Sequence, residues 1–169
     1  VIRQYADDTN LSVRIKLHAK HSTNPQGFVP WLFDHYEFAG NYNILELGCG
    51  NGGQWEGRIE HLPDGCRLIL SDFSDGMFDI VRRKYSEHSQ VSFQQADIQD
   101  LPYANDIFDV VIANHMLYHI PDLPKALSEV KRVLKAGGTF YSTTNGTQGM
   151  QFYLHQAIKK LHPATKAFM

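Results

Sequence analysis

The stretch "GCGNGG" carries four glycines, Gly48, Gly50, Gly52 and Gly53, directly after an apolar run. Glycine lets a backbone enter conformations that other residues avoid, and it lets a ligand approach the main chain closely. A tight turn alone needs fewer glycines, so the stretch predicts a ligand-binding loop. Two motifs fit it: G-x-G-x-x-G, which ends at Gly53 and is typical of dinucleotide sites, and an acidic-x-G-x-G-x-G pattern that begins at Glu46.

The glycines alone do not decide between the two motifs. A carboxylate such as Glu46 beside the loop would repel a pyrophosphate. An NAD-linked oxidoreductase that uses the G-x-G-x-x-G spacing is the alternative on the glycines alone, and a non-catalytic cofactor-binding or interaction protein is another.

An acid also ends the next apolar run, "RLILSD", at Asp72. At this distance from a glycine loop, a carboxylate can accept hydrogen bonds from both ribose hydroxyls. The alternative role is to cap the helix that follows. Because Ser74 or Asp75 can provide that cap, we expect Asp72 to serve the ligand.

Asp97 and Ile98 follow the third apolar run. A carboxylate next to an apolar side chain suits adenine, since the acid accepts from the exocyclic amine and the apolar residue covers the ring. The alternative is a surface acid that opens a turn.

The stretch "NHMLYHIPD" after the fourth run combines polar and titratable residues, among them Asn114, His115, Tyr118 and His119. The two histidines are four positions apart and could form a metal pair on a helix. No third ligand is spaced near them, so we predict no metal site. For His119, a packing role beneath the loop and a role facing the substrate remain open.

Short apolar runs alternate with amphipathic segments from residue 42 onward. This pattern predicts strands at 42–47, 67–72, 91–97, 108–114 and 138–144, and helices at 54–62, 75–87, 123–135 and 148–161, the third helix being ended by Gly137 and Gly138. Alternation of this kind implies a doubly wound, mostly parallel Rossmann-like sheet with helices on both faces. Ligands of such sheets bind beyond the carboxyl ends of the strands, where all the residues above are expected.

The bulk composition indicates an ordinary globular domain. The chain has 169 residues and a formal net charge of -2, which argues against nucleic acid or an anionic membrane as a partner. No apolar run is long enough to span a membrane. We interpret Cys49 and Cys66 as free thiols of a reducing compartment, the cytoplasm. Residues 1–40 are predicted to form a helical lid and residues 41–169 the cofactor-binding core.

The order of these motifs resembles that of class I S-adenosylmethionine-dependent methyltransferases. The resemblance rests on "ILELGCGNGG", "LILSDFSDGM", "QQADIQDLPYANDIFDVVIANHMLYHIPD" and "ALSEVKRVLKAGG", and it covers roughly Asn43 to Thr144. The likeness is greatest to the subgroup that methylates small molecules, although Ala136 stands where proline is usual. The chain lacks the Asn-Pro-Pro-Tyr motif of amino-group methylases that act on bases and glutamine. A small-molecule acceptor, methylated on O, N or C by direct displacement, is therefore expected.

The resemblance implies roles for individual residues. The amino-acid end of S-adenosylmethionine would be held by Glu46 and by the backbone of Gly48, Cys49, Gly50 and Gly52. The ribose would be bound by Asp72, and the adenine pocket would be lined by Phe73 and Met77. The adenine edge would contact Asp97 and Ile98, and the methionine part would contact Asn114 and His115. S-adenosylhomocysteine would be the product. Candidates for a general base are His115, Tyr118, His119 and His18, and lid or substrate contacts would come from Tyr5, Arg14, His18, Trp31 or Phe33.

The resemblance also implies a missing piece. The family sheet usually ends in an antiparallel hairpin beyond the fifth strand, and the residues after 144 leave no room for it. We therefore expect the fifth strand's edge to be covered by a partner chain, as in a homodimer, or the chain to be a fragment. A paired sixth strand within residues 145–169 would contradict this expectation.

Overall fold

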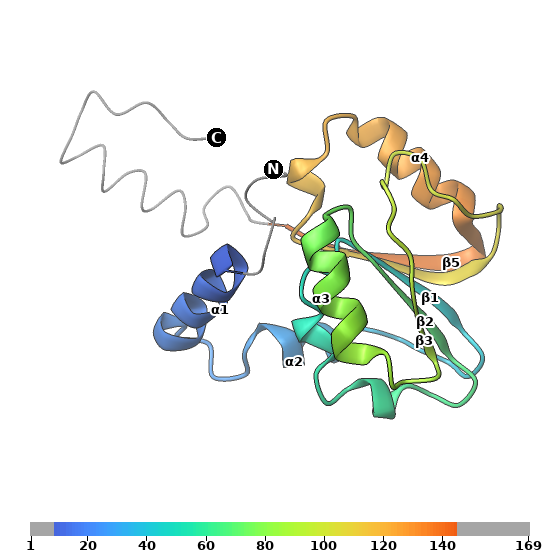
Figure 1. Ribbon diagram of the computed structural model, residues 1–169. Helices are drawn as coiled ribbons and strands as arrows, with labels where there is room; N and C mark the ends of the chain where they lie inside the picture. Colours follow the sequence, from blue (N-terminus) through green and yellow to red (C-terminus); the bar gives the residue numbers. More distant parts are fainter. Residues whose placement is uncertain (1–8, 145–169) are drawn as a thin grey trace, which may run out of the picture.

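The computed structural model describes residues 9–144 (Figure 1). Its elements are listed here in chain order: α1 (Thr9–His21), α2 (Phe28–Phe33), β1 (Asn43–Leu47), the 3-10 turns η2 (Gly53–Trp55) and η3 (Ile59–His61), β2 (Arg67–Ser71), α3 (Asp75–Tyr85), β3 (Val91–Phe93), β4 (Phe108–Asn114), the 3-10 turn η4 (Leu117–His119), α4 (Leu123–Val133) and β5 (Leu134–Thr143).

The five strands form one sheet in the order β3-β2-β1-β4-β5, and every neighbouring pair is parallel. The chain first builds outward from β1 to β3 and then returns to place β4 beside β1. The strand order therefore reverses between β1 and β4, where parallel sheets bind their ligands. This confirms the predicted Rossmann-like architecture and brings the end of β1 beside the end of β4.

Helices cover both faces of the sheet. On one face, Val81 and Tyr85 of α3 pack with Ile44 of β1 in a cluster that also contains Trp55. On the other face, Val130 of α4 packs with residues of β1 and β4 in a second cluster. Figure 1 shows α3 and α4 on opposite sides of the strands. β1 and β4 are buried on both faces, as their continuous apolar sequences require.

The predicted helix at 54–62 is wrong. The chain there makes two separate 3-10 turns, η2 and η3. Glu56 is extended, with ψ 120°, and Gly57 has a φ of 64°, so the backbone leaves helical geometry between them. The glycine loop is therefore followed directly by 3-10 turns and not by the N-terminus of an α-helix.

Two strand boundaries also differ from the predictions. β3 ends at Phe93, so Asp97 and Ile98 lie in a loop beyond it. α4 ends at Val133, and β5 starts at Leu134, before the glycines that were expected to end the helix. Leu134 already pairs with Phe108, and an irregularity follows before Thr139 pairs with Val110.

The C-terminal predictions fall mostly outside the described residues. Within residues 9–144, β5 forms an edge of the sheet. The predicted helix at 148–161 lies beyond them. The expected covering of the β5 edge stays a prediction, as does the division at residue 40.

Candidate functional site

The glycine loop turns through left-handed backbone conformations directly after β1. Gly48, Gly50 and Gly52 have φ angles of 68°, 56° and 69°. A Cβ at Gly52 would lie 2.6 Å from Tyr85 Cε2, and one at Gly48 would lie 2.9 Å from the Met116 side chain. Both the backbone conformation and the close packing therefore require glycine at these two positions.

Asp72 ties the glycine loop to the end of β2. Its Oδ2 accepts a hydrogen bond from Gly50 N at 2.9 Å, and its Oδ1 accepts one from Ser74 N at 2.9 Å. Burial outweighs these bonds and raises the pKa of Asp72. Ser74 occupies the N-cap position of α3, as one of the two expected capping residues, but makes no capping hydrogen bond with its side chain. The role of Asp72 toward a ligand stays a prediction.

Glu46 is a buried carboxylate beneath the loop, 2% exposed. Gln54 Nε2 donates to its Oε1 at 2.7 Å, and Trp55 Nε1 donates to its Oε2. Burial raises the pKa of Glu46 to about 8, although both hydrogen bonds act in the opposite direction. Glu46 can therefore gain or lose its proton near neutral pH.

Asn114, the last residue of β4, joins four segments of the chain. Its Nδ2 donates to Tyr36 Oη at 2.6 Å and to Gln54 Oε1 at 3.0 Å. Its Oδ1 accepts from Thr143 Oγ1 at 2.9 Å. Because Gln54 also bonds Glu46, one polar network runs across the ends of β1, β4 and β5.

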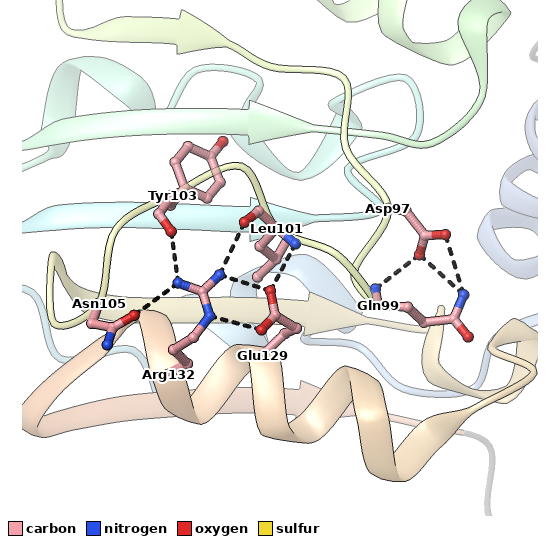
Figure 2. Close-up of polar contacts among 7 residues, drawn as sticks. All are labelled: Asp97, Gln99, Leu101, Tyr103, Asn105, Glu129 and Arg132. Carbon is pink, nitrogen blue, oxygen red and sulfur yellow. Dashed lines mark hydrogen bonds and ion pairs between the residues drawn. The ribbon is translucent and has the colours of Figure 1, made fainter.

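Asp97 shapes a tight turn after β3 (Figure 2). Its Oδ1 accepts from Gln99 N at 2.8 Å, and Gln99 Nε2 lies 3.2 Å from each of its carboxylate oxygens. The turn is closed by Asp100 N, which donates to Asp97 O at 3.0 Å. Ile98 is buried against the α4 face of the sheet.

The remaining predicted cofactor contacts differ in exposure. Phe73 is 55% exposed. Met77 and Cys49 are buried, and burial raises the pKa of the Cys49 thiol. Cys49 therefore stays a neutral thiol, and its backbone N–H, which donates to Ser71 O at 2.9 Å, anchors the loop.

His115 and His119 do not lie on one helix, since only His119 belongs to η4. His115 has a φ of 51° and its N–H donates to Thr143 O at 2.9 Å. His119 ends η4 and packs against Tyr118, with ring centroids 4.4 Å apart. Burial lowers the pKa of both histidines, and the nearby His18 and Arg14 act in the same direction on His115 and His119 respectively. Both imidazoles are thus neutral at pH 7 and able to accept a proton.

The helix α1 lies at the site. Leu11 Cδ2 would be 3.0 Å from a Cβ at Gly50, so this side chain packs on the glycine loop. His18 and Arg14 are close enough to influence His115 and His119. Figure 1 shows α1 beside the end of the sheet where β5 finishes.

Trp31 of α2 is 38% exposed and packs against His35, with ring centroids 4.4 Å apart. Phe28 carries the contact from α2 to the site, with its ring 4.9 Å from that of His115. Phe33 faces the core, edge-on to Trp55 at 5.3 Å. Tyr5, the remaining lid candidate, lies outside the described residues.

Several residues of this candidate site were not predicted from the sequence: Leu11, Tyr36, Gln54, Trp55 and Thr143. The position of Gln54 and Trp55 directly after the glycines was the available signal, but both were assigned to a helix. Tyr36 lies far from the site in sequence, and no motif marks it. Among residues 9–144, no helix is long and apolar enough to cross a membrane, and no group of three metal-binding side chains occurs.

Comparison with known families agrees with this geometry. Residues 45–142, more than half of the chain, match the model of the methyltransferase domain. The chain belongs to this methyltransferase family.

Curated relatives and solved structures similar to this chain are also named methyltransferases. The chain is 36% identical over 95 residues to a demethylmenaquinone methyltransferase from Clavibacter sepedonicus, covering 56% of this chain and 38% of the relative. It is 32% identical over 101 residues to the ubiquinone/menaquinone biosynthesis C-methyltransferase UbiE of Proteus mirabilis, covering 58% of this chain and 40% of that one. The chain thus spans well under half the length that these relatives have.

A SAM-dependent methyltransferase from Aquifex aeolicus has the same fold. It superimposes with a TM-score of 0.67 at 12% identity, over 89% of this chain and 87% of that chain.

Proposed function

We propose that this chain is the cofactor-binding core of an S-adenosylmethionine-dependent methyltransferase with a small-molecule acceptor. The observation that carries the proposal is the placement of three acids along the carboxyl ends of adjacent parallel strands. Glu46 is near the end of β1, Asp72 directly follows β2, and Asp97 lies in the loop after β3. Asp72 also accepts a hydrogen bond from Gly50 N of the glycine loop. Membership of the methyltransferase family supports the same reading.

The residues present fit this cofactor. An ionised carboxylate offers about four acceptor sites, so Asp72 can bind ribose hydroxyls while it keeps its bonds to Gly50 and Ser74. Glu46, ionised when a cation binds, would provide a negative charge for the ammonium group, and the exposed side chain of Phe73 could stack on adenine. Asp97 and Ile98 would meet the adenine edge, and Asn114 and His115 the methionine part. A dinucleotide would instead bring its phosphates toward Glu46, which disfavours the NAD-linked alternative.

The bound cofactor would supply an already activated methyl group on a sulfonium. The protein then has to align the acceptor and exclude water, which is mainly an orientation effect. The neutral imidazoles of His115 and His119 can accept a proton from an acceptor that must lose one. Tyr118, which contacts His119, and His18 on α1 would assist at the same place.

We further propose that α1 and α2 act as the lid over this site, with Arg14, His18 and Trp31 toward the acceptor. The packing of Leu11 on the glycine loop supports this role. The curated relatives are named for demethylmenaquinone methylation and for ubiquinone/menaquinone biosynthesis, and these names support a small-molecule acceptor. The buried free thiols Cys49 and Cys66 support a reducing, cytoplasmic location, and the edge position of β5 supports a homodimer that covers it.

Isothermal titration calorimetry with S-adenosylhomocysteine and, separately, with NAD tests the proposal. We expect saturable binding of S-adenosylhomocysteine and none of NAD. Asp72→Ala should weaken the first by about 100-fold, since it removes charge-assisted bonds to the ribose and to the loop. Binding of NAD alone would overturn the proposal. Binding of S-adenosylhomocysteine without methyl transfer to any acceptor in a screen would favour the non-catalytic alternative.

A further inference from the structure

The loop between β3 and β4 is held by one arginine of α4 (Figure 2). Arg132 Nη2 donates to Leu101 O at 2.9 Å, and its Nη1 donates to Tyr103 O at 2.7 Å and to Asn105 Oδ1 at 3.0 Å. On its other side, Arg132 forms a two-bond ion pair with Glu129, through Nε at 2.7 Å and Nη2 at 2.7 Å. The guanidinium therefore binds three loop residues while a carboxylate fixes its orientation.

Glu129 also contacts the loop directly. Its Oε2 accepts from Leu101 N at 2.9 Å, so both backbone groups of Leu101 are bound by this ion pair. The neighbouring Arg132 lowers the pKa of Glu129 to about 2, which keeps the carboxylate charged under all ordinary conditions. Pairing of this kind is stronger than between neutral groups, and the planar fork of arginine gives it direction.

The opposite end of α4 contacts the same loop. Asp122 N, at the start of α4, donates to Gln99 Oε1 at 3.1 Å. Gln99 in turn donates to the carboxylate of Asp97. The start of α4 is thus connected to the turn that carries Asp97 and Ile98, while Glu129 and Arg132 bind the residues directly after this turn, beginning at Leu101. No helix or strand is present between Phe93 and Phe108 in the described structure, so these contacts replace regular structure there.

We propose that Glu129 and Arg132 are positioning residues that set the place of Asp97 and Ile98 against the adenine edge of the cofactor. The inference rests on the proposed function, because it presumes that an adenine nucleoside binds at the ends of the strands. It assigns the ion pair a role in ligand discrimination, in addition to any contribution to stability. The physical reason is that a loop without regular structure holds a carboxylate in one place only if neighbouring elements bind its backbone.

A comparison of two ligands separates recognition of the adenine amine from overall affinity. S-adenosylhomocysteine has the exocyclic amine that Asp97 would accept, whereas S-inosylhomocysteine has a carbonyl oxygen there. We expect the wild-type chain to prefer the first by about tenfold or more in calorimetric Kd, as for a hydrogen bond to a charged group. Asp97→Ala is the reference variant, and its preference should fall to about one.

Arg132→Lys and Glu129→Gln test the positioning role. Lysine keeps the charge but loses the planar fork that reaches three loop residues, and glutamine keeps an acceptor for Leu101 N but loses the ionic pair. We expect both variants to reduce the preference for S-adenosylhomocysteine to about threefold or less. Lys135→Ala is the matched control, because it removes an ion pair of similar exposure, with Asp109 at 2.8 Å, away from this loop. Its preference should equal that of the wild type.

The outcomes separate the two proposals. Failure of the wild-type chain to bind S-adenosylhomocysteine would overturn the proposed function and, with it, this inference. If the wild type binds but both variants keep the full preference, or if the wild type has none, the inference alone is wrong. Circular dichroism establishes that each variant is folded, and if Arg132→Lys does not fold, Glu129→Gln decides.

Discussion

The indole Nε1 of Trp55 donates a hydrogen bond to Oε2 of Glu46, while Gln54 donates to the other oxygen of the same carboxylate. The two residues that follow the glycine loop therefore satisfy the acid that precedes it. Two hydrogen bonds thus hold the buried carboxyl group of Glu46 in place. Its raised pKa makes this arrangement sensitive to pH.

The first prediction concerns proton exchange at Glu46. Its pKa in the folded protein is about 8, above the ordinary value of 4.5. At pH 7 the carboxyl is mainly protonated, and a bound cation favours the ionised form, so binding of S-adenosylhomocysteine should release up to about one proton. Calorimetry at pH 7 in buffers of different ionisation enthalpy measures this release. Glu46→Gln should abolish it, and an unchanged release in this variant would contradict the assignment.

The same shift predicts how stability depends on pH. Because the folded protein holds this proton more tightly than the unfolded chain, Glu46 lowers the free energy of unfolding as the pH rises from about 4.5 to about 8. The stability of Glu46→Gln relative to wild type should therefore increase over this window and stay constant above it. Urea unfolding at several pH values checks the direction, and a relative stability that falls with pH would be inconsistent with a raised pKa.

A pair of glycine variants tests the packing of the loop. Gly52→Ala combines a left-handed φ with a Cβ 2.6 Å from Tyr85, so it should destabilise by about 3 kcal/mol or more and weaken cofactor binding. Gly57 has a similar φ of 64° but nothing within 4 Å of its Cβ position. Gly57→Ala should therefore cost only about 1 kcal/mol. Thermal unfolding of both variants gives the comparison, and equal losses would show that packing at Gly52 is not tight.

Removal of the hydroxyl group should have different effects on stability at two tyrosines. Tyr36 Oη accepts a bond from Asn114, so Tyr36→Phe leaves a donor without that partner and should cost about 1–3 kcal/mol. The hydroxyl of Tyr103 is buried and has no hydrogen-bond partner among the described residues. Tyr103→Phe should therefore be neutral or stabilising by about 1 kcal/mol. Chemical denaturation measures both, and a large loss in Tyr103→Phe would reveal a partner for this hydroxyl.

His115 is expected to act at the cofactor mainly through its backbone. Asparagine tolerates a φ of 51° and keeps the N–H that donates to Thr143, whereas valine does not tolerate this conformation. The Kd of His115→Asn for S-adenosylhomocysteine should stay within about threefold of wild type. His115→Val should bind the same ligand about tenfold or more weakly than wild type. If His115→Asn keeps binding but loses methyl transfer, the imidazole is the general base. Loss of binding in His115→Asn would show instead that the imidazole itself contacts the cofactor.

The parallel sheet and the edge that carries the site were both predictable from the sequence. Alternating apolar runs and amphipathic segments imply parallel strands, and parallel strands bring the residues after them to one edge whatever the details of the connections. For that reason the sequence predicts that the glycine loop, Glu46, Asp72, Asp97 and Asn114 lie toward the same edge of the sheet.

What the sequence could not show are the contacts between residues far apart in the chain. The reading of residues 54–62 as a helix followed their apolar spacing, yet the extended Glu56 and left-handed Gly57 divide the segment so that Gln54 and Trp55 can reach Glu46.

Tyr36 and Arg132 lie in ordinary amphipathic surroundings, and only the folded chain brings them to Asn114 and to the backbone of the β3–β4 loop. Local patterns thus determined which residues gather at the carboxyl edge. The tertiary structure decided which side chains hold them there, because hydrogen-bond partners are selected by distance in space and not by spacing along the chain.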